Sequence, residues 1–252
     1  MHILFTNDDG IESPGLHALI NAALRRRHRA TVCAPAEQQS AASQRIHLNA
    51  PIMVRKMHLF EGVDAWAVSG TPADCVRIAL ELDDDQPDVC ISGINDGENA
   101  GCAVFYSGTV AAAREAAMHG IPAFAVSILL HADEAMMDAL AALSLDMAER
   151  SCLACFPRLS VVNINAPAIP AENWKGIRYT TVSQAFYHDS YEHRVSPRGQ
   201  EYFWVRGGLP MDEPEPGSDY DLLLQGYVTV SVIGGYADLN SRADQFLPPQ
   251  ES

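Results

Sequence analysis

Short apolar runs alternate with segments of helical periodicity over the first two thirds of this chain. The runs that predict buried strands are residues 2–6, 30–34, 65–68, 87–91, 121–127 and 159–164. The segments that predict helices are residues 14–24, 71–82, 110–119 and 133–150. Strand and helix repeats of this kind form a parallel sheet covered by helices. The alternation therefore predicts an α/β fold with a doubly wound, mostly parallel sheet.

The pattern changes from about Lys175. The following β-rich runs, separated by polar loops, are residues 177–182, 202–205 and 227–233. Residues 211–221 are acidic and rich in turn-forming residues. Short β-rich runs separated by polar loops are typical of hairpins and edge strands. We therefore predict a single domain over residues 1–252, with an α/β core that carries the active site (1–174) and a β-rich C-terminal extension (175–252).

The charge of the chain excludes several classes of partner. The formal net charge is -15, from 17 Lys and Arg against 32 Asp and Glu. Such a protein repels nucleic-acid backbones and anionic membranes, whose binding normally begins with a basic patch. No apolar run approaches the roughly 20 residues that a membrane-spanning helix needs. We therefore expect neither a nucleic-acid duplex nor a membrane among the partners, whereas a small anion held by a metal ion stays compatible.

The six cysteines lie mostly within apolar or small-residue runs, and no secretory signal precedes the first predicted strand. Cys152 and Cys155 have the spacing of a redox motif or of half a zinc site, but a second cysteine pair is missing. We therefore expect reduced, structural cysteines and a cytoplasmic location.

Two adjacent carboxylates, Asp8 and Asp9, follow the first predicted strand and precede Gly10. Ligands of open α/β sheets bind beyond the carboxyl ends of the strands, and paired carboxylates suit a hard cation that carries phosphate. A dinucleotide-binding turn would have Gly-x-Gly-x-x-Gly at this place. A Gly-x-Ser-x-Gly elbow and a Walker Gly-x-x-x-x-Gly-Lys are also missing from the sequence. The sequence thus favours metal and phosphate chemistry over hydride transfer, esterase or P-loop kinase chemistry.

Two further oxygen donors follow other predicted strands. Ser40 lies in the loop after the second strand, and Asn95 lies in a glycine-rich loop after the fourth. Two carboxylates, one hydroxyl and one amide are typical ligands of Mg²⁺ or Mn²⁺, whereas zinc and copper prefer His or Cys. We therefore predict one divalent cation per subunit, bound by Asp8, Asp9, Ser40 and Asn95.

The start of the helix predicted at residues 110–119 favours an anion. Ser107, Gly108 and Thr109 form its first turn, where unpaired N–H groups, hydroxyls and the positive end of the helix dipole are available. We predict that this helix start binds phosphate oxygens opposite the metal. Asp8 or Asp9 is then best placed to orient or deprotonate the attacking water, and the residues do not distinguish between them.

Taken together, these motifs resemble the SurE family of nucleotidases, the stationary-phase survival proteins. The resemblance covers nearly the whole chain. It is carried by Asn7-Asp8-Asp9-Gly10, Ala34-Pro35 with Ser40, the residues 70–76 (Gly-Thr-Pro-Ala-Asp-Cys-Val), Ser92-Gly93-Ile94-Asn95 with Gly97 and Asn99, the residues 106–113 (Tyr-Ser-Gly-Thr-Val-Ala-Ala-Ala), Asn163-Ile164-Asn165-Ala166-Pro167, Pro197-Arg198-Gly199 and Gly226-Tyr227-Val228.

The resemblance implies a divalent-metal-dependent phosphatase that acts on nucleoside 5'-monophosphates, often on 3'-monophosphates, and sometimes on short polyphosphate. It also implies a Rossmann-like core and a C-terminal arm exchanged between the subunits of a homodimer or homotetramer. The family's functional residues fall on Asp8, Asp9, Ser40 and Asn95 for the metal and on Asn99, Ser107, Gly108 and Thr109 for the phosphate.

One segment departs from the family pattern. The loop before the metal serine usually carries basic residues, but here residues 36–41 read Ala-Glu-Gln-Gln-Ser-Ala. Asp96 and Glu98 add negative charge beside Asn95. An acidic rim should disfavour highly charged polyphosphate relative to a monophosphate.

Two other functions remain open from the residues alone. A nucleotide or phosphate sensor could use the same fold without turnover, because fold does not determine function. A phosphoryl-transferring enzyme could use Asp8 or Asp9 as a nucleophile, although Asn7-Asp8-Asp9-Gly10 lacks the Asp-x-Asp spacing of that chemistry.

Overall fold

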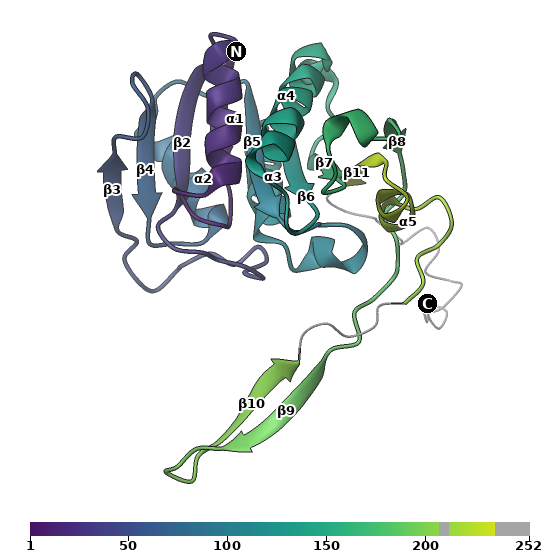
Figure 1. Ribbon diagram of the computed structural model, residues 1–252. Coiled ribbons are helices and arrows are strands. Elements are labelled where there is room, and N and C mark those ends of the chain that lie inside the picture. Colours follow the sequence, from purple (N-terminus) through teal and green to yellow (C-terminus); the bar gives the residue numbers. More distant parts are fainter. Residues whose placement is uncertain (207–211, 235–252) are drawn as a thin grey trace, which may run out of the picture.

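A mixed, mostly parallel sheet forms the centre of the molecule (Figure 1). The computed structural model describes residues 1–206 and 212–234. Within these residues the main sheet has nine strands in the order β3-β4-β2-β1-β5-β6-β7-β11-β8. The strands are β1 (His2–Thr6), β2 (Arg29–Pro35), β3 (Val54–Met57), β4 (Asp64–Val68), β5 (Val89–Asp96), β6 (Ala123–Ile128), β7 (Ser160–Ala166), β8 (Ile177–Tyr179) and β11 (Val228–Gly234).

The six strands from β4 to β7 in this order run parallel to one another. Strand β3 is antiparallel to β4, and β11 is antiparallel to β7. The parallel strands confirm the predicted doubly wound α/β fold. Every one of the six predicted buried strands of the core is present.

Helices cover both faces of the sheet (Figure 1). Helices α1 (Pro14–Arg25) and α4 (Glu134–Arg150) pack on one face, and α2 (Pro72–Leu82) and α3 (Gly108–Met118) pack on the other. Strand β1 shows why both faces are apolar, because Ile3 and Phe5 join the core under α1 and Leu4 joins the core under α2 and α3. Successive side chains of a strand point to opposite faces, so a strand covered on both sides is apolar throughout.

Capping residues mark where the core helices begin. The Ser13 side chain accepts a hydrogen bond from the Leu16 N–H at the start of α1, and Pro14 fits its first turn. Thr71 and Asp74 form a capping box at the start of α2. No helix in the described part of the chain is long and apolar enough to cross a membrane.

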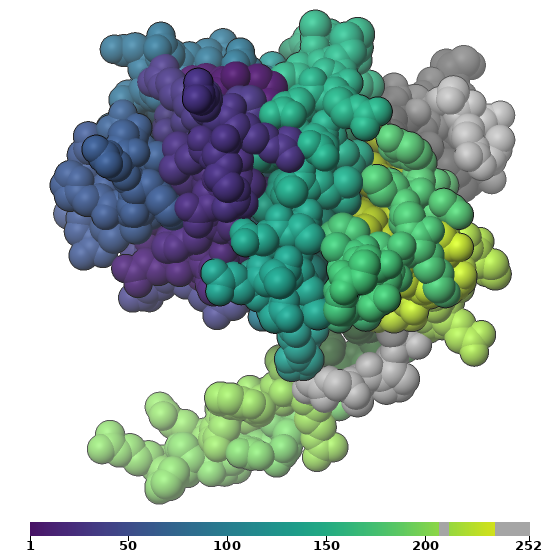
Figure 2. Space-filling view, turned by 45° about the horizontal axis from the view of Figure 1, so that its top comes forward, coloured from purple at the N-terminus to yellow at the C-terminus, as the bar shows by residue number. Residues whose placement is uncertain are grey.

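The C-terminal part divides between the main sheet and a projecting hairpin. Strands β11 and β8 extend the sheet beyond β7, although the sequence analysis placed both in the extension. Strands β9 (Ser190–Val195) and β10 (Glu201–Arg206) form a separate antiparallel hairpin that stands away from the body (Figures 1 and 2). The short helix α5 (Asp219–Leu224), capped by Ser218, lies where the sequence predicted acidic turns.

The expectation that all cysteines are reduced is wrong for two of them. Cys152 and Cys155 form a disulfide, and both are exposed. They flank a short 3₁₀ turn after α4, in which the Cys155 N–H donates to the Cys152 carbonyl at 2.8 Å. The turn holds their Cα atoms 5.2 Å apart, within bonding range. Cys33, Cys75, Cys90 and Cys102 are free.

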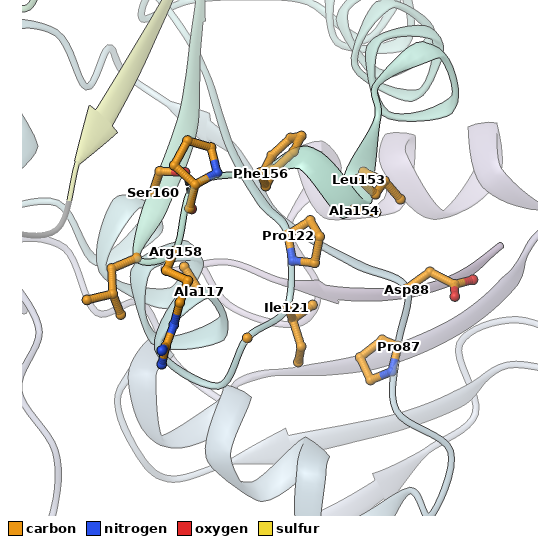
Figure 3. Close-up of a pocket in the computed structure, with 13 residues that line it drawn as sticks. Pro87, Asp88, Ala117, Ile121, Pro122, Leu153, Ala154, Phe156, Arg158 and Ser160 are labelled. Atoms are coloured by element: carbon orange, nitrogen blue, oxygen red, sulfur yellow. Dashed lines mark hydrogen bonds between the residues drawn. The ribbon is translucent and has the colours of Figure 1, made fainter.

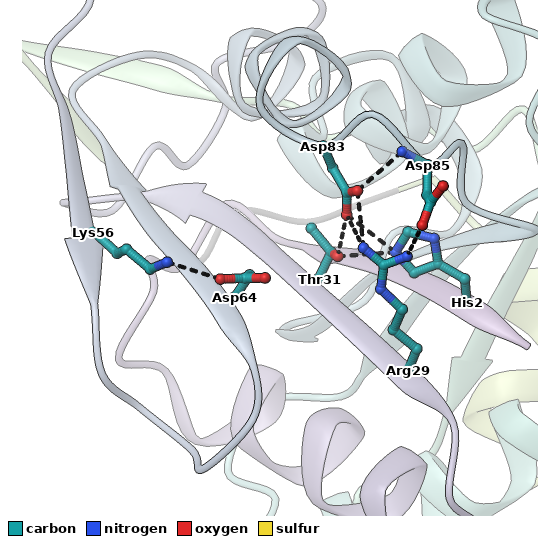
Figure 4. Close-up of polar contacts among 7 residues, drawn as sticks. All are labelled: His2, Arg29, Thr31, Lys56, Asp64, Asp83 and Asp85. Carbon is teal, nitrogen blue, oxygen red and sulfur yellow. Dashed lines mark hydrogen bonds and ion pairs between the residues drawn. The ribbon is translucent and has the colours of Figure 1, made fainter.

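Ion pairs lie at the edge of the sheet where the parallel strands begin (Figure 4). The Arg29 guanidinium donates to Asp83 at 2.9 Å and to Asp85 at 2.6 Å, and the Thr31 hydroxyl donates to Asp83 at 2.9 Å. Lys56 pairs with Asp64 on the neighbouring strands. The contacts of Arg29 and Thr31 connect β2 to the residues at the end of α2. They lie at the edge of the sheet opposite the predicted site.

Candidate metal and phosphate site

The predicted site residues meet at the carboxyl edge of three adjacent strands. Because β1 lies between β2 and β5, the segments that follow these strands are neighbours. The Gln39 N–H donates to the Asp8 carbonyl at 2.7 Å, and the Asp96 N–H donates to the Asp9 carboxylate at 3.1 Å. Gln39, the neighbour of Ser40, thus contacts Asp8, and Asp96, the neighbour of Asn95, contacts Asp9.

Asn7 shapes the turn that carries the two carboxylates. Its side-chain amide donates to the Gly10 carbonyl at 2.9 Å and to Ser13 at 2.6 Å, and its Oδ1 accepts from the Gly10 N–H. Gly10 has φ +103°, which favours glycine. This structural role of Asn7 could not be predicted from the sequence, because its partners Gly10 and Ser13 come into reach only in the folded turn between β1 and α1.

Asp8 is buried against the start of α3. The Thr109 hydroxyl donates to its Oδ1, and only 4% of the residue is exposed. A Cβ on Gly108 would lie 2.7 Å from the Asp8 Cβ, so any side chain larger than hydrogen would push the carboxylate aside. Gly108 is therefore required for the close approach of the start of α3 to Asp8.

Asn95 is placed by an irregularity in β5. The pairing of β5 with β6 shifts register between Ser92 and Asn95, which redirects the following side chains. The Asn95 amide donates to the Gly97 carbonyl at 2.6 Å, which leaves its Oδ1 available to a cation. A Cβ on Gly15 would lie 2.1 Å from the Ile94 carbonyl oxygen, so α1 packs directly against this irregular segment.

Ser40 lies in an exposed turn anchored at both ends. Besides the contact of Gln39 with Asp8, the Ser43 N–H donates to the Tyr106 carbonyl at 3.0 Å and the Ser43 hydroxyl donates to the Phe105 carbonyl at 2.9 Å. These bonds connect the Ser40 loop to the residues just before α3. The structure thus brings the loop to the site and leaves the Ser40 side chain exposed to solvent.

The pKa values of both carboxylates are raised. Burial, with a contribution from the Asp9 charge, raises the pKa of Asp8 to about 6, although the Thr109 hydrogen bond opposes this shift. Burial and the nearby charge of Asp96 also raise the pKa of Asp9. No Lys, Arg or His among the described residues lowers either pKa. A buried and a partly buried carboxylate side by side, without a basic partner, fit a hard divalent cation with oxygen ligands.

The predicted phosphate-binding residues have two different surroundings. The Ser107 side chain caps α3 by accepting from the Val110 N–H at 3.0 Å. The Thr109 main chain, like its hydroxyl, is hydrogen-bonded to the Asp8 carboxylate. The Gly108 N–H lies in the same first turn, where a helix offers main-chain donors to an anion. Asn99 is almost fully buried, and its side-chain amide donates inward to the Ser127 hydroxyl at 2.8 Å. The structure therefore places Asn99 behind the site surface, whereas the helix start lies beside Asp8.

Comparison with known proteins identifies the family. Residues 3–189 match the family model described as "Survival protein SurE". The chain belongs to the SurE family. A relative from Fervidobacterium nodosum named "5'-nucleotidase SurE" is 40% identical over 92% of this chain and 91% of its own length. A relative of the same name from Nitratidesulfovibrio vulgaris is 42% identical over 92% of this chain and 86% of its own.

The SurE fold is also shared with a solved structure. The crystal structure of the SurE protein from Aquifex aeolicus matches 97% of each chain with a TM-score of 0.78 and 30% sequence identity. The resemblance read from the motifs is thus confirmed at the level of family and fold.

A cavity of about 420 Å³ borders Asp9 in this SurE family member. Its lining includes Asp9, Glu12, Glu37 and Asp96, and it contains no Lys, Arg or His among the described residues. A second cavity, of about 360 Å³, lies at the opposite edge of the sheet between Pro87, Pro122, Phe156 and Arg158 (Figure 3). Of these two cavities, the one beside Asp9 borders a predicted site residue.

Proposed function

We propose that this chain is a divalent-metal-dependent phosphatase that hydrolyses nucleoside 5'-monophosphates, and 3'-monophosphates as well, to nucleoside and phosphate. The observation that carries the proposal is the pair of buried Asp8 and partly buried Asp9 beside the start of α3, without a basic partner among the described residues. The proposal is supported by the relatives in the family that are named 5'-nucleotidase SurE.

We propose that Asp8, Asp9, Ser40 and Asn95 hold one Mg²⁺ or Mn²⁺ per subunit. When bound, the cation supplies Lewis-acid stabilisation of charge on the phosphoryl group. The N–H groups at the start of α3 bind the remaining phosphoryl oxygens from the other side, so that the developing charge meets donors already in place. Asp8 is confined by Thr109 and by burial, which leaves the more accessible Asp9 to orient or deprotonate the attacking water.

The decisive experiment measures phosphate release from AMP by the purified protein. We expect release with Mn²⁺, loss of release to background after chelation with EDTA, and recovery when excess Mn²⁺ is restored. A protein that binds AMP with Mn²⁺ but releases no phosphate would be a sensor rather than an enzyme. An acyl-phosphate trapped on Asp8 or Asp9 would instead favour the phosphoryl-transfer alternative.

The acidic cavity beside Asp9 should select against highly charged substrates. We expect the double variant Glu12→Lys/Glu37→Lys to raise kcat/KM for tripolyphosphate relative to AMP by about 3- to 10-fold, because two repulsive charges become attractive. The gain should shrink in 0.5 M salt, where charges are screened over a few ångströms. Glu81→Lys, an exposed position at the far end of α2, is the matched control and should leave the ratio unchanged.

We also propose that the chain assembles as a homodimer or homotetramer through the region 175–252. The β9–β10 hairpin supports this, because it exposes more than half of Tyr191, Phe203, Trp204 and Val205 away from the body. Apolar surface of this kind typically marks an interface. The remainder of the predicted C-terminal arm, residues 235–252, lies outside the described residues.

A further inference from the structure

The loop between Asn95 and α3 leaves the sheet at Asp96, so its main chain needs other hydrogen-bond partners. At Asn99 these partners are side chains of β7. The Asn99 N–H donates to the Asn165 Oδ1 at 2.8 Å, and the Asn99 carbonyl accepts from the Asn163 amide at 2.8 Å and from the Asn165 amide at 3.3 Å. Both main-chain groups of Asn99 are thus bound by two asparagines.

These asparagines are unusual for their place in the sheet. Asn163 and Asn165 are fully buried in a strand that has neighbours on both sides. Amides are costly to bury unless they are hydrogen-bonded, and strands at such positions are normally apolar. Along β7, Val161, Asn163 and Asn165 alternate onto the sheet face that α3 covers. The two amides therefore point to the face where the loop crosses.

Two further contacts hold the loop near Asn99 in place. Asn165 lies beside Ser127 in the register of β6 and β7, and Ser127 accepts the side-chain amide of Asn99. Two residues further on, the Gly101 N–H points to the buried carboxylate of Asp219 at 3.2 Å. The loop is therefore fixed at Asn99 by the sheet and at Gly101 by α5.

We propose that Asn163 and Asn165 are positioning residues, which hold the main chain at Asn99 and so set the distance between the Asn95 metal ligand and the phosphate-binding start of α3. This inference rests on the proposed function. The loop connects the two halves of the site, and a displacement of about 1 Å in such a site can lower the rate about 100-fold.

The test uses Asn165→Ala and Asn163→Ala in the full chain. For Asn165→Ala we expect kcat/KM for AMP with Mn²⁺ to fall about 100-fold, and hydrogen exchange of the peptide covering residues 97–101 to accelerate at least tenfold. Asn163→Ala should show the same two changes to a smaller degree, since Asn165 still holds both main-chain groups. Asn165→Ser, whose side chain is too short to reach Asn99, serves if the alanine variant fails to fold.

Two matched controls lie on the adjacent strand. Thr229 and Ser231 stand opposite Asn165 and Asn163 in β11, are buried, and have hydroxyls without a partner among the described residues. Thr229→Val and Ser231→Ala should keep kcat/KM and loop exchange within twofold of the wild type. Equal losses in the controls would overturn the proposal, as would a folded Asn165 variant with unchanged exchange at residues 97–101.

The exchange measurement separates this inference from the proposed function. If the wild type releases no phosphate but Asn165→Ala accelerates exchange of the loop, the function fails and the positioning role stands. If the wild type hydrolyses AMP and Asn165→Ala retains both its rate and its slow exchange, the function stands and the positioning role fails.

Discussion

Asp9→Asn should lower kcat for AMP hydrolysis by about 10³-fold or more with Mn²⁺ present. In the proposed mechanism the substitution removes half of the negative charge of the metal-binding pair and the group that orients the attacking water, and loss of one such electrostatic contribution alone costs about 10²- to 10³-fold. The Asp96 N–H can still donate to the remaining Oδ atom, so the turn itself should persist. Steady-state phosphate release, measured over a range of Mn²⁺ concentrations, checks the expectation.

The control for Asp9→Asn is Asp96→Asn. Asp96 is exposed and contacts Asp9 through its main-chain N–H, which the substitution keeps. Its loss of side-chain charge should change kcat by less than about fivefold. Near-normal turnover by a folded Asp9→Asn protein in saturating Mn²⁺ would remove Asp9 from the mechanism.

Asp8→Asn should abolish activity and yet make the metal-free protein more stable at neutral pH. Burial holds the folded-state pKa of Asp8 at about 6, above the value of 3.8 in an unfolded chain. Each pKa unit corresponds to about 1.4 kcal/mol, so an ionised Asp8 costs the folded protein about 2–3 kcal/mol at pH 7. Asparagine removes the charge and keeps an oxygen that accepts from Thr109.

The pH dependence gives the sign of this effect. Because the pKa is raised on folding, the stability associated with protonated Asp8 is present below about pH 4 and is lost as the pH rises through 6. The excess stability of Asp8→Asn should therefore be near zero at pH 3.5 and reach about 2–3 kcal/mol at pH 7, or about 4–12 °C in Tm for a chain of this size.

Thermal unfolding in EDTA at pH 3.5, 5 and 7 measures this dependence. Asp84→Asn, an exposed carboxylate on a surface turn, is the control and should stay within about 0.5 kcal/mol of the wild type. Addition of Mn²⁺ should raise the Tm of the wild type and not that of Asp8→Asn. An Asp8→Asn protein that unfolds earlier than the wild type at pH 7 in EDTA would show that the buried charge is not destabilising.

The features that the sequence predicted are those with local signals. Buried strands such as residues 30–34 are marked by continuous apolar runs, and α1 is marked by Ser13 and Pro14 at its start. Because parallel strands present their carboxyl ends at one edge, the position of Asp8 and Asp9 after β1 was sufficient to place them near the end of the neighbouring strand β5. The α/β core was predictable for these reasons.

The features that escaped prediction depend on partners distant in the chain. Strand β11 completes the main sheet through its pairing with β7, and neither the run at 227–233 nor its flanks indicates that partner. Strands β3 and β9 are mostly exposed and lack an apolar pattern. The position of Asn99 likewise depends on distant partners, because its main-chain N–H is bound by Asn165 and its side chain by Ser127.

The two ends of the parallel strands differ in which substitutions they tolerate. The Asp8–Asp9 pair and the start of α3 lie at one edge. The Arg29 ion pairs and the Cys152–Cys155 bridge lie toward the other, where Leu153 and Ala154 line a cavity with Pro87 and Pro122. Sequence drift or engineering at the latter edge can therefore adjust thermal resistance without touching turnover. The edge with Asp8 and Asp9, by contrast, must keep glycines at positions 15 and 108, where even one methyl group collides with its neighbour.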